Sequence, residues 1–513
     1  MSRLSQIPWR FWRRGAQVAG LLLFLWLFRK TEYSGVAEIP GAANILFRLD
    51  PLVALCVTLA RKWAVPTVLW SLLLVALTVV LGRFFCGWVC PLGTLLDAAR
   101  RLVGTRLPTR SLNHRWQHAK YFLLGVVLLS AVLGLPLVGY FDPFSILMRG
   151  LTCVVDPVWG RGVTGVFTWL YQHAPPAVTN VSEPVYAFLR KTVLPFQNAV
   201  FSFGGVALVI LLVPFALELV QRRFWCRCIC PLGGLLALLS RRSLVRRLPV
   251  KGCKDCGICG EICRMDAFDA GGRLVPEECN LCMDCIDDCP HDRAKLIVRR
   301  ASAKPLPLDP SRRLFIGTLA AGVTLPVVAW AWRLDRRVPP QLLRPPGAGN
   351  EPEFLDQCVR CGECLKVCPT NALQPTLWEA GAEGMFSPRL VARMGYCEYN
   401  CTLCGELCPT GAIRRLPLAE KQHTAIGLAV FDKDRCLPFA KGQSCIVCEE
   451  HCPTPDKAIK FRETEVKTEQ GEKAVVKQPY VVRDLCIGCG ICETKCPLAG
   501  PAAVHVVRVE SVV

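Results

Sequence analysis

Long apolar stretches alternate with arginine-rich segments through the first two thirds of the chain. A helix needs about 20 apolar residues to cross the hydrocarbon core of a bilayer, so four stretches qualify as spans and a shorter, tryptophan-flanked one is marginal. The four are residues 63–82, 121–141, 192–217 and 314–332, and the shorter one is residues 15–28. The shorter stretch has no small-residue cleavage site before Arg29, so we expect a retained helix rather than a cleaved signal peptide. The pattern predicts about five transmembrane helices.

Basic residues indicate how these helices are oriented. They gather in the first 14 residues, between residues 83 and 120, and between residues 222 and 251. Because loops rich in Lys and Arg stay in the cytoplasm, we expect a multi-pass protein of a bacterial inner (cytoplasmic) membrane with a cytoplasmic N-terminus. Residues after the fifth span would then be periplasmic. The formal charge of +20 would otherwise suggest nucleic acid, but its placement beside apolar spans argues against that partner.

The membrane part contains an internal repeat. Residues 83–96 and 223–236 are identical at nine of fourteen positions, and both carry the motif C-x3-C-P-L-G. An Asp-Pro step precedes each copy, at Asp50 and at Asp142. Both motif-bearing spans run in the same direction, so the halves would be related by an axis along the membrane normal. Such an axis could bring the cysteines of both motifs together at the cytoplasmic edge.

Composition adds one decisive feature, which is the 31 cysteines. Twenty-four of them form six quartets, and proline follows the last cysteine in five of the six, whereas Arg264 follows in the other. Four quartets have the form C-x2-C-x2-C-x3-C: Cys253, Cys256, Cys259, Cys263; Cys279, Cys282, Cys285, Cys289; Cys358, Cys361, Cys364, Cys368; and Cys486, Cys489, Cys492, Cys496. Two are stretched: Cys397, Cys401, Cys404, Cys408; and Cys436, Cys445, Cys448, Cys452. Three thiolates two residues apart can wrap an iron–sulfur cube, whereas structural zinc prefers separated C-x2-C pairs. The spacing predicts six 4Fe–4S clusters.

The fourth cysteine of such a run ligates the neighbouring cluster. We therefore expect Cys289 to complete the cluster of the run that begins at Cys253, and Cys263 that of the run that begins at Cys279. In the C-terminal part the regular quartets lie outermost, which favours nested pairing; sequential pairing is the alternative. In the outer nested pair, Cys496 would complete the run that begins at Cys358, and Cys368 would complete the run that begins at Cys486. In the inner pair, Cys452 would complete the run that begins at Cys397, and Cys408 would complete the run that begins at Cys436.

These features predict an α-helical, internally repeated membrane domain joined to α+β ferredoxin-like domains. The expected divisions are a four-helix membrane domain over residues 1–247, a cytoplasmic two-cluster ferredoxin over 248–300, a fifth transmembrane helix or twin-arginine-like segment over 305–337, and a periplasmic four-cluster ferredoxin over 347–513. Arg312 and Arg313 open the last span in a sequence that fits either a twin-arginine export signal or ordinary positive flanking.

The membrane part with its two C-x3-C-P motifs and two-cluster ferredoxin resembles NapH, and also the related NosR and CcoG proteins. Residues 305–513 resemble the exported NapG and MauM ferredoxins, so the chain is similar to a NapH–NapG fusion. This resemblance implies electron flow from quinol to a periplasmic acceptor, a cytochrome or a reductase. No flavin attachment motif, no C-x2-C-H and no histidine inside an apolar span is present, so we expect neither flavin nor haem.

Four cysteines of the repeat remain: Cys86, Cys90, Cys226 and Cys230. Each pair is spaced i, i+4, so in a helix both thiols share one face. Across a pseudo-twofold axis the four could hold a further iron–sulfur cluster, or they could be redox-active or structural pairs.

Asp50 and Asp142 are candidates for handling quinol and its protons, although helix capping is the simpler explanation for these residues. His114 and His118 are further candidates; the alternative is that they are solvent-exposed residues flanking the span. The favoured function is a membrane quinol dehydrogenase that works with lipid and the quinone pool. An electron donor for metal-cofactor maturation, of the NosR or CcoG type, and a redox sensor are the alternatives.

Overall fold

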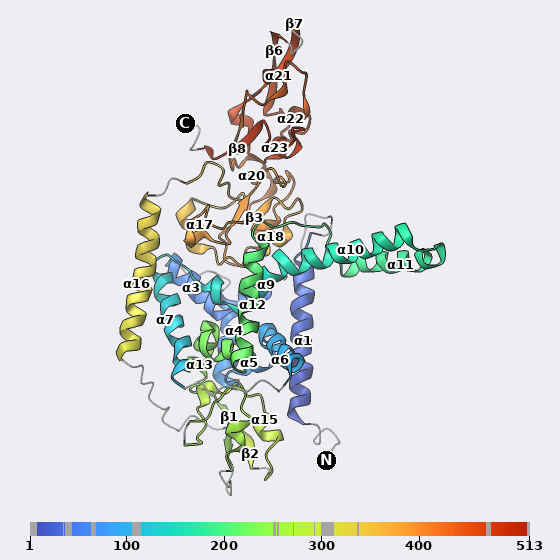
Figure 1. The fold of residues 1–513 in the computed structure, drawn as a ribbon. Coiled ribbons are helices and arrows are strands. Elements are labelled where there is room, and N and C mark those ends of the chain that lie inside the picture. The colour runs from blue at the N-terminus through green and yellow to red at the C-terminus, as the bar shows by residue number, and fades with distance from the viewer. Residues whose placement is uncertain are drawn as a thin grey trace. The chain divides into compact units, whose positions relative to one another are not determined.

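The computed structural model describes residues 8–33, 35, 44–62, 68–104, 114–249, 253, 256–269, 271–291, 293–298, 312–335, 338–467 and 473–509. The chain, whose elements are labelled in Figure 1, divides into two compact units by the contacts within each. Unit 1 comprises Met1–Arg29, Ala42–Gly150 and Gly205–Trp330, and unit 2 comprises Lys30–Gly41, Leu151–Gly204 and Ala331–Val513. Unit 2 therefore combines the C-terminal part of the chain with two segments from its N-terminal half.

Unit 1 contains two copies of one helical pattern, in line with the sequence repeat. Each copy has a short helix ending at Asp-Pro, a helix that begins at that proline, an apolar helix, and two further elements separated at the C-x3-C-P motif. The first copy is α2 (Ile45–Leu49), α3 (Pro51–Arg61), α4 (Val68–Leu81), α5 (Phe84–Trp88) and α6 (Pro91–Val103). The second is α8 (Val138–Phe141), α9 (Pro143–Gly150), α12 (Gly204–Val220), the π-helical turn Trp225–Ile229 and α13 (Pro231–Ser240).

The core of unit 1 lies where the two copies meet. Helix α7 (Ala119–Val132) packs against α3 of the first copy and α13 of the second, and both of these also contact α4 (Figure 1). Leu52, Val127 and Leu236, one from each of α3, α7 and α13, are completely buried. Burial of large apolar side chains is the main favourable term in such packing, so the two copies stabilise each other. Two long helices, α1 (Trp9–Lys30) and α16 (Arg312–Asp335), also belong to this unit, except for their last residues.

Two predicted spans have bounds that differ from those expected: one is interrupted and the other begins later. The span at 121–141 is interrupted after α7, because Gly134 adopts a φ of +80° and Pro136 follows. The span at 192–217 begins only at α12, because Pro195 and the left-handed Phe203 (φ +62°) prevent a continuous helix. Residues 63–67 and 305–311, which belong to two other predicted segments, lie outside the described residues. Within the described part of the chain, one helix is long and apolar enough to cross a membrane, over Arg312–Ala331 of α16.

The remaining elements of unit 1 form a small ferredoxin-like fold. Strands β1 (Val245–Pro249) and β2 (Ala294–Val298) pair antiparallel, with Val245 opposite Val298. They enclose two short helices, α14 (Ile258–Glu261) and α15 (Asp284–Asp287), and the 3₁₀ turn Pro276–Glu278. Both cysteine runs of residues 253–289 therefore lie between two paired strands.

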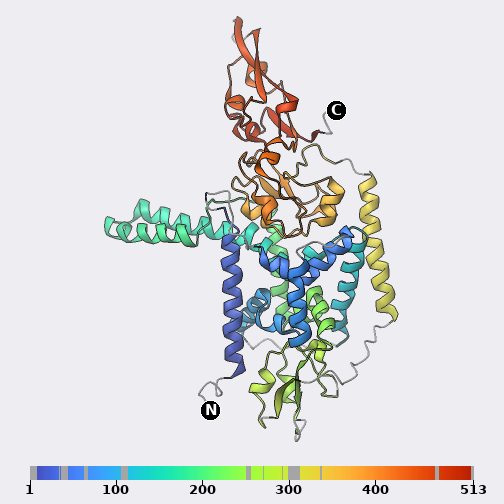
Figure 2. The same cartoon turned by 180° about the vertical axis from the view of Figure 1, so that it is seen from behind.

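The second copy of the repeat carries an insertion that belongs to unit 2. Between α9 and α12 the chain forms the π-helical turn Leu151–Val155, then α10 (Asp156–His173) and α11 (Pro176–Thr192), which lie side by side as a hairpin (Figures 1 and 2). The segment that follows this hairpin is bound to the ferredoxin of the same unit. Asn371 Nδ2 and Gln374 Nε2 both donate to the Val200 carbonyl, at 2.7 and 3.0 Å.

The C-terminal part of unit 2 consists of short helices and three two-stranded antiparallel sheets. The helices are α17 (Glu351–Gln357), α18 (Glu363–Val367), α19 (Leu403–Leu407), α20 (Leu418–His423), α21 (Leu437–Ala440), α22 (Val447–Glu450) and α23 (Ile491–Lys495). The strands are β3 (Leu373–Pro375) with β4 (Pro388–Leu390), β5 (Leu428–Phe431) with β8 (Val504–Val507), and β6 (Ile459–Lys467) with β7 (Lys473–Val481). The pairing of β5 with β8 brings the last strand back to the start of the second cysteine-rich half.

Candidate iron–sulfur centres

Each regular cysteine run turns sharply after its second cysteine. Gly257, Gly362 and Gly490 hold that position in three runs with φ values of +77°, +89° and +84°, and Met283 holds it in the fourth with +64°. A left-handed residue reverses the chain direction into the short helix that carries the third cysteine. The three thiols of each run therefore surround one point, as a cluster requires.

The two runs in unit 1 exchange their fourth cysteines. The thiols of Cys253, Cys256 and Cys289 lie near that of Cys259, and Cys263 lies near Cys279 and Cys282. This is the arrangement that the spacing predicts. In addition, Arg247 Nη2 donates to Cys259 Sγ at 2.8 Å, so a fixed positive charge lies beside one ligand.

In unit 2 the nested pairing is wrong. Cys408 lies with the run of Cys358, Cys361 and Cys364, and Cys368 lies with that of Cys397, Cys401 and Cys404. Further along the chain, Cys496 joins the run that begins at Cys436, and Cys452 joins the run that begins at Cys486. The fourth ligands are thus exchanged between sequential neighbours, because α18 packs directly against α19 and α22 against α23.

Cavities mark three of these four sites. Hollows of about 380, 370 and 330 Å³ are lined by the quartets completed by Cys496, Cys408 and Cys452, respectively. Among the described residues, no group of three or more His, Cys, Asp or Glu side chains is close enough to hold a single metal ion. Four thiols around a hollow instead fit a multi-iron cluster.

The protonation of the ligands couples cluster binding to folding. Burial raises the pKa of the Cys279 thiol to about 12 and that of Cys489 to about 11. Iron binds the thiolate, so a bound cluster replaces protons that these buried thiols otherwise retain at neutral pH. Cluster assembly therefore contributes free energy to the folding of both ferredoxin parts.

The four cysteines of the repeat also converge. Cys226 and Cys86 lie near Cys90, and all three lie near Cys230. The two cysteines of each motif do not lie on one continuous α-helix, since Cys90 and Cys230 cap the new helices α6 and α13 at their Cys-Pro steps. The convergence nevertheless supplies the four thiols that either a further cluster or redox-active pairs would need.

Two arginines join the copies around these thiols in a pseudo-twofold arrangement. Arg223 Nη1 donates to the Cys86 carbonyl at 3.1 Å, and Arg83 Nη2 donates to the Cys226 carbonyl at 3.5 Å. Each guanidinium lies over the glycine of the opposite C-P-L-G sequence. A Cβ atom at Gly93 would lie 2.8 Å from Arg223 Nη1, and one at Gly233 would lie 3.1 Å from Arg83 Nη2. Glycine at both positions therefore allows this approach.

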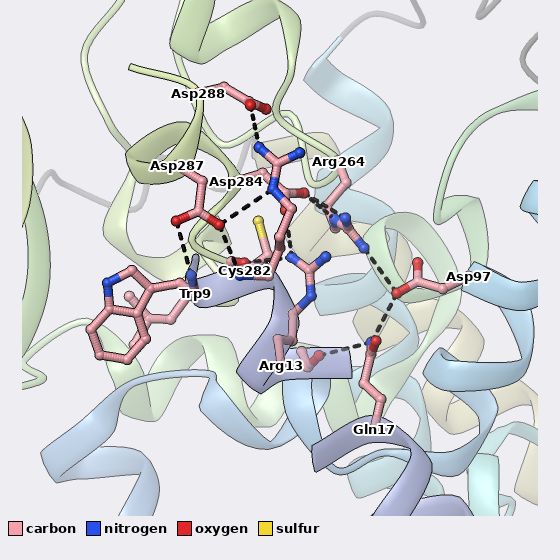
Figure 3. A network of polar contacts seen from close by, with 12 residues as sticks. Trp9, Arg13, Gln17, Asp97, Arg264, Cys282, Asp284, Asp287 and Asp288 are labelled. Carbon is pink, nitrogen blue, oxygen red and sulfur yellow. Dashed lines mark hydrogen bonds and ion pairs between the residues drawn. The ribbon is translucent and has the colours of Figure 1, made fainter. Parts of the chain in front are cut away.

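A buried ionic network links the repeat to the ferredoxin of unit 1 (Figure 3). Asp97 on α6 accepts from Arg264 Nη1 at 2.9 Å and Gln17 Nε2 at 2.9 Å. It also accepts from Arg223 Nη2 at 2.7 Å. Arg264 Nε also donates to Asp284 Oδ2 at 2.8 Å. Arg264 occupies the position that proline holds in the other five quartets. The exception in the motif thus has a structural role, which sequence reasoning noted without explaining.

The network fixes the charges of its carboxylates. Burial acts to raise the pKa of Asp97, but the Arg223 and Arg264 guanidinium groups outweigh burial and hold this pKa well below its ordinary value. Near the start of the second cysteine run, Glu278 accepts from Tyr121 Oη at 3.0 Å, Arg83 Nη1 at 3.3 Å and the Lys120 ammonium. Asp97 and Glu278 were not predicted. The available signal for Asp97 was that it is the single acidic residue of α6, beside the apolar residues Leu95 and Leu96.

Asp50 and Asp142 are both helix caps and are fully buried. Asp50 Oδ1 accepts from the amides of Leu52 and Val53 at 2.8 and 3.2 Å, and Asp142 Oδ2 accepts from the Ser145 amide at 2.7 Å. Their other oxygens receive no hydrogen bond from the described residues, although the two carboxyl groups are in contact. We therefore expect the two carboxyl groups to share one proton, because an ionised carboxylate can only accept a hydrogen bond.

Substitution of Asp50 tests this pairing. Asp50→Asn keeps the capping oxygen and adds an amide donor toward Asp142, so we expect a thermal midpoint at pH 7 equal to or above that of the wild type. Asp50→Ala removes the cap and should cost about 1–2 kcal/mol. Equal destabilisation by both variants in thermal unfolding would contradict the shared proton.

The histidine candidates receive no support from the structure. His118 is exposed, with its ring centroid 6.3 Å from that of Tyr121. His114 begins the 3₁₀ turn His114–His118, but its side chain lies outside what the structure describes.

Comparison with protein families matches the same regions. A model described as a 4Fe-4S binding domain matches residues 63–110 and again 203–251, which contain the two C-x3-C-P motifs. A 4Fe-4S dicluster domain matches residues 357–412, and a 4Fe-4S binding domain matches residues 479–499. The first two quartets of unit 2 lie together within the dicluster match. Fold, thiol geometry and family models define an iron–sulfur protein of the ferredoxin type that transfers electrons.

Individual relatives make the assignment more specific. The methylamine utilization ferredoxin-type protein MauM of Methylorubrum extorquens is 40% identical over 210 residues, which cover 39% of this chain and 90% of MauM. The ferredoxin-type protein NapG of Escherichia coli is 41% identical over 162 residues, 31% of this chain and 68% of NapG. NapF of the same organism is 32% identical over 162 residues, 31% of this chain and 84% of NapF. The chain belongs to the MauM/NapG family of ferredoxin-type proteins. No solved structure matches it.

Proposed function

We propose that this protein is a quinol dehydrogenase of a bacterial inner membrane, in which a NapH-like membrane part is fused to a NapG-like ferredoxin. It would hold six 4Fe–4S clusters, oxidise quinol, and pass the electrons through clusters of this set to a periplasmic cytochrome or reductase. The clusters supply one-electron transfer, and the chain supplies their spacing and surroundings. Apolar helices α4, α12 and α16, with arginine-rich flanks, support the membrane assignment.

One observation carries this proposal. The C-terminal ferredoxin forms a compact unit with two segments that adjoin apolar helices, Lys30–Gly41 after α1 and Leu151–Gly204 before α12. Chain segments next to membrane helices lie at the membrane surface, so the ferredoxin would be held where a lipid-soluble donor can reach it.

The test is reduction of the clusters by quinol. In membranes containing the full chain, menaquinol or ubiquinol should produce the electron paramagnetic resonance signals of reduced 4Fe–4S clusters, and 2-heptyl-4-hydroxyquinoline N-oxide should suppress them. Dithionite reduction of the same sample is the control for cluster content. Clusters that respond to dithionite but to neither quinol would contradict the proposal and favour a sensing role.

A further inference from the structure

A hollow in unit 2 contacts both the membrane-adjacent segments and a cluster ligand. It measures about 370 Å³, partly open to solvent, and its wall includes Cys368. Unlike the hollows inside the cysteine quartets, it is lined by polar and aromatic side chains from Glu32–Tyr33, the π-helical turn at Thr152, and the loop before α12. π-Helical turns inside helices often occur at functional sites.

Two polar atoms in this wall lack protein partners among the described residues. Thr152 is 1% exposed, and its Oγ1 makes no hydrogen bond. Asn371 Oδ1 is likewise buried and without a partner, while Asn371 Nδ2 donates to the Val200 carbonyl, which fixes the orientation of the amide. Leaving a buried polar group without a hydrogen bond is unfavourable, so such atoms beside a hollow indicate a ligand.

The chemistry of the wall suits a dihydroxy aromatic ring. The rings of Tyr33 and Phe196 meet edge to face, with centroids 5.3 Å apart. Glu32 and Asp156 contribute carboxylates, and both contact the Lys366 ammonium, Glu32 Oε2 at 3.4 Å. The hollow thus combines an aromatic surface, two hydrogen-bonding atoms without partners among the described residues, and two carboxylates. This combination is expected of a small-molecule site.

The position along the chain fits a ligand that arrives from lipid. Glu32 follows α1 by two residues, and Phe196 lies in the loop that leads to α12. On the other side, Gln197 Nε2 donates to the Cys368 carbonyl at 3.1 Å, so the same loop touches the ligand of the cluster held with Cys397, Cys401 and Cys404.

We propose that this hollow is the site of quinol oxidation, with Thr152 and Asn371 binding the quinol oxygens and Glu32 and Asp156 accepting its protons. The inference rests on the proposed function. Quinol loses two electrons and two protons and leaves as quinone. Cys368, with Cys397, Cys401 and Cys404, would hold a cluster that supplies a one-electron acceptor used twice for each quinol, and Glu32 and Asp156 would release the two protons to solvent.

The assignment changes the expected route of the electrons. Electrons would enter the clusters of unit 2 from quinol bound within the same unit. No electron would then need to cross the bilayer from the two cytoplasmic clusters.

Binding of 2-heptyl-4-hydroxyquinoline N-oxide, measured by quenching of its fluorescence on the purified full chain, tests the site without turnover. Thr152→Val keeps the shape but removes the hydroxyl, and we expect its affinity to fall roughly tenfold, the loss of one hydrogen bond. Thr152→Ser keeps the hydroxyl and should bind as the wild type does. Glu32→Gln should slow quinol-driven cluster reduction about a hundredfold. The exposed Glu183→Gln, on α11 of the same unit, is the matched control.

Iron content and dithionite-reduced spectra verify that each variant is folded and loaded. Wild-type affinity in Thr152→Val, together with an unchanged rate in Glu32→Gln, would overturn the site. If the wild type itself is not reduced by quinol, the proposed function fails; if it is reduced and these variants match it, only this location fails.

Discussion

Replacing Cys368 and Cys401 together by alanine will remove no more iron than replacing either one alone. Both thiols face Cys404, so they belong to the same cluster, and the loss of one cluster is about four irons whichever ligand is removed. Iron per polypeptide, measured on the purified full chain, gives the result directly.

The matched double variant combines Cys368→Ala with Cys489→Ala. The structure places Cys489 with Cys486 and Cys452, in a different cluster, so this pair should lose about eight irons. Nested pairing predicts the reverse, with the larger loss in the Cys368 and Cys401 pair. The two double variants therefore separate the two ligand assignments.

Asp97→Asn will strongly destabilise unit 1. The carboxylate is buried and shared by Arg223 and Arg264, and its removal leaves two guanidinium groups without a counter-charge at that point. Breaking a buried ion pair costs about 3–5 kcal/mol. The measurement is the thermal midpoint followed by tryptophan fluorescence. The control is Asp269→Asn, whose partner Arg273 is largely exposed and whose ion pair should contribute less than about 1 kcal/mol.

The stabilisation that Asp97 contributes also depends on pH. Because the folded-state pKa of Asp97 is depressed, its stabilisation is fully present above its unfolded value of 3.8 and is lost as pH falls through the lower folded pKa. The difference in midpoint between wild type and Asp97→Asn should therefore be constant near neutral pH and shrink in acid. A difference that grows as pH falls below 3.8 would contradict this assignment.

The sequence predicted local features more successfully than neighbours in space. The cysteine spacing indicated cluster ligands, and the repeated C-x3-C-P motif indicated two matching halves, because both depend on residues close along the chain. The nested pairing failed because sequence separation does not reveal that α18 packs on α19. Which thiol completes which cluster depends on that packing.

Helix ends and the polar network show a second limit. Hydropathy predicted a continuous span at 192–217, but the backbone at Pro195 and Phe203 delays the helix to Gly204. Asp97 was missed because its role depends on Arg223 and Arg264, which are 126 and 167 residues away along the chain. Such charges become interpretable only once the fold brings them together.

The inserted segment between α9 and α12 makes binding of the ferredoxin to it independent of protein concentration. Its hydrogen bonds from Asn371 and Gln374 to Val200 join parts of one polypeptide, so their association is intramolecular. A covalent tether replaces a bimolecular encounter by an intramolecular one, whose effective concentration is set by the chain and not by dilution. Docking of the ferredoxin on this segment is therefore independent of dilution and of expression level, whereas two separate subunits joined by the same few contacts would dissociate.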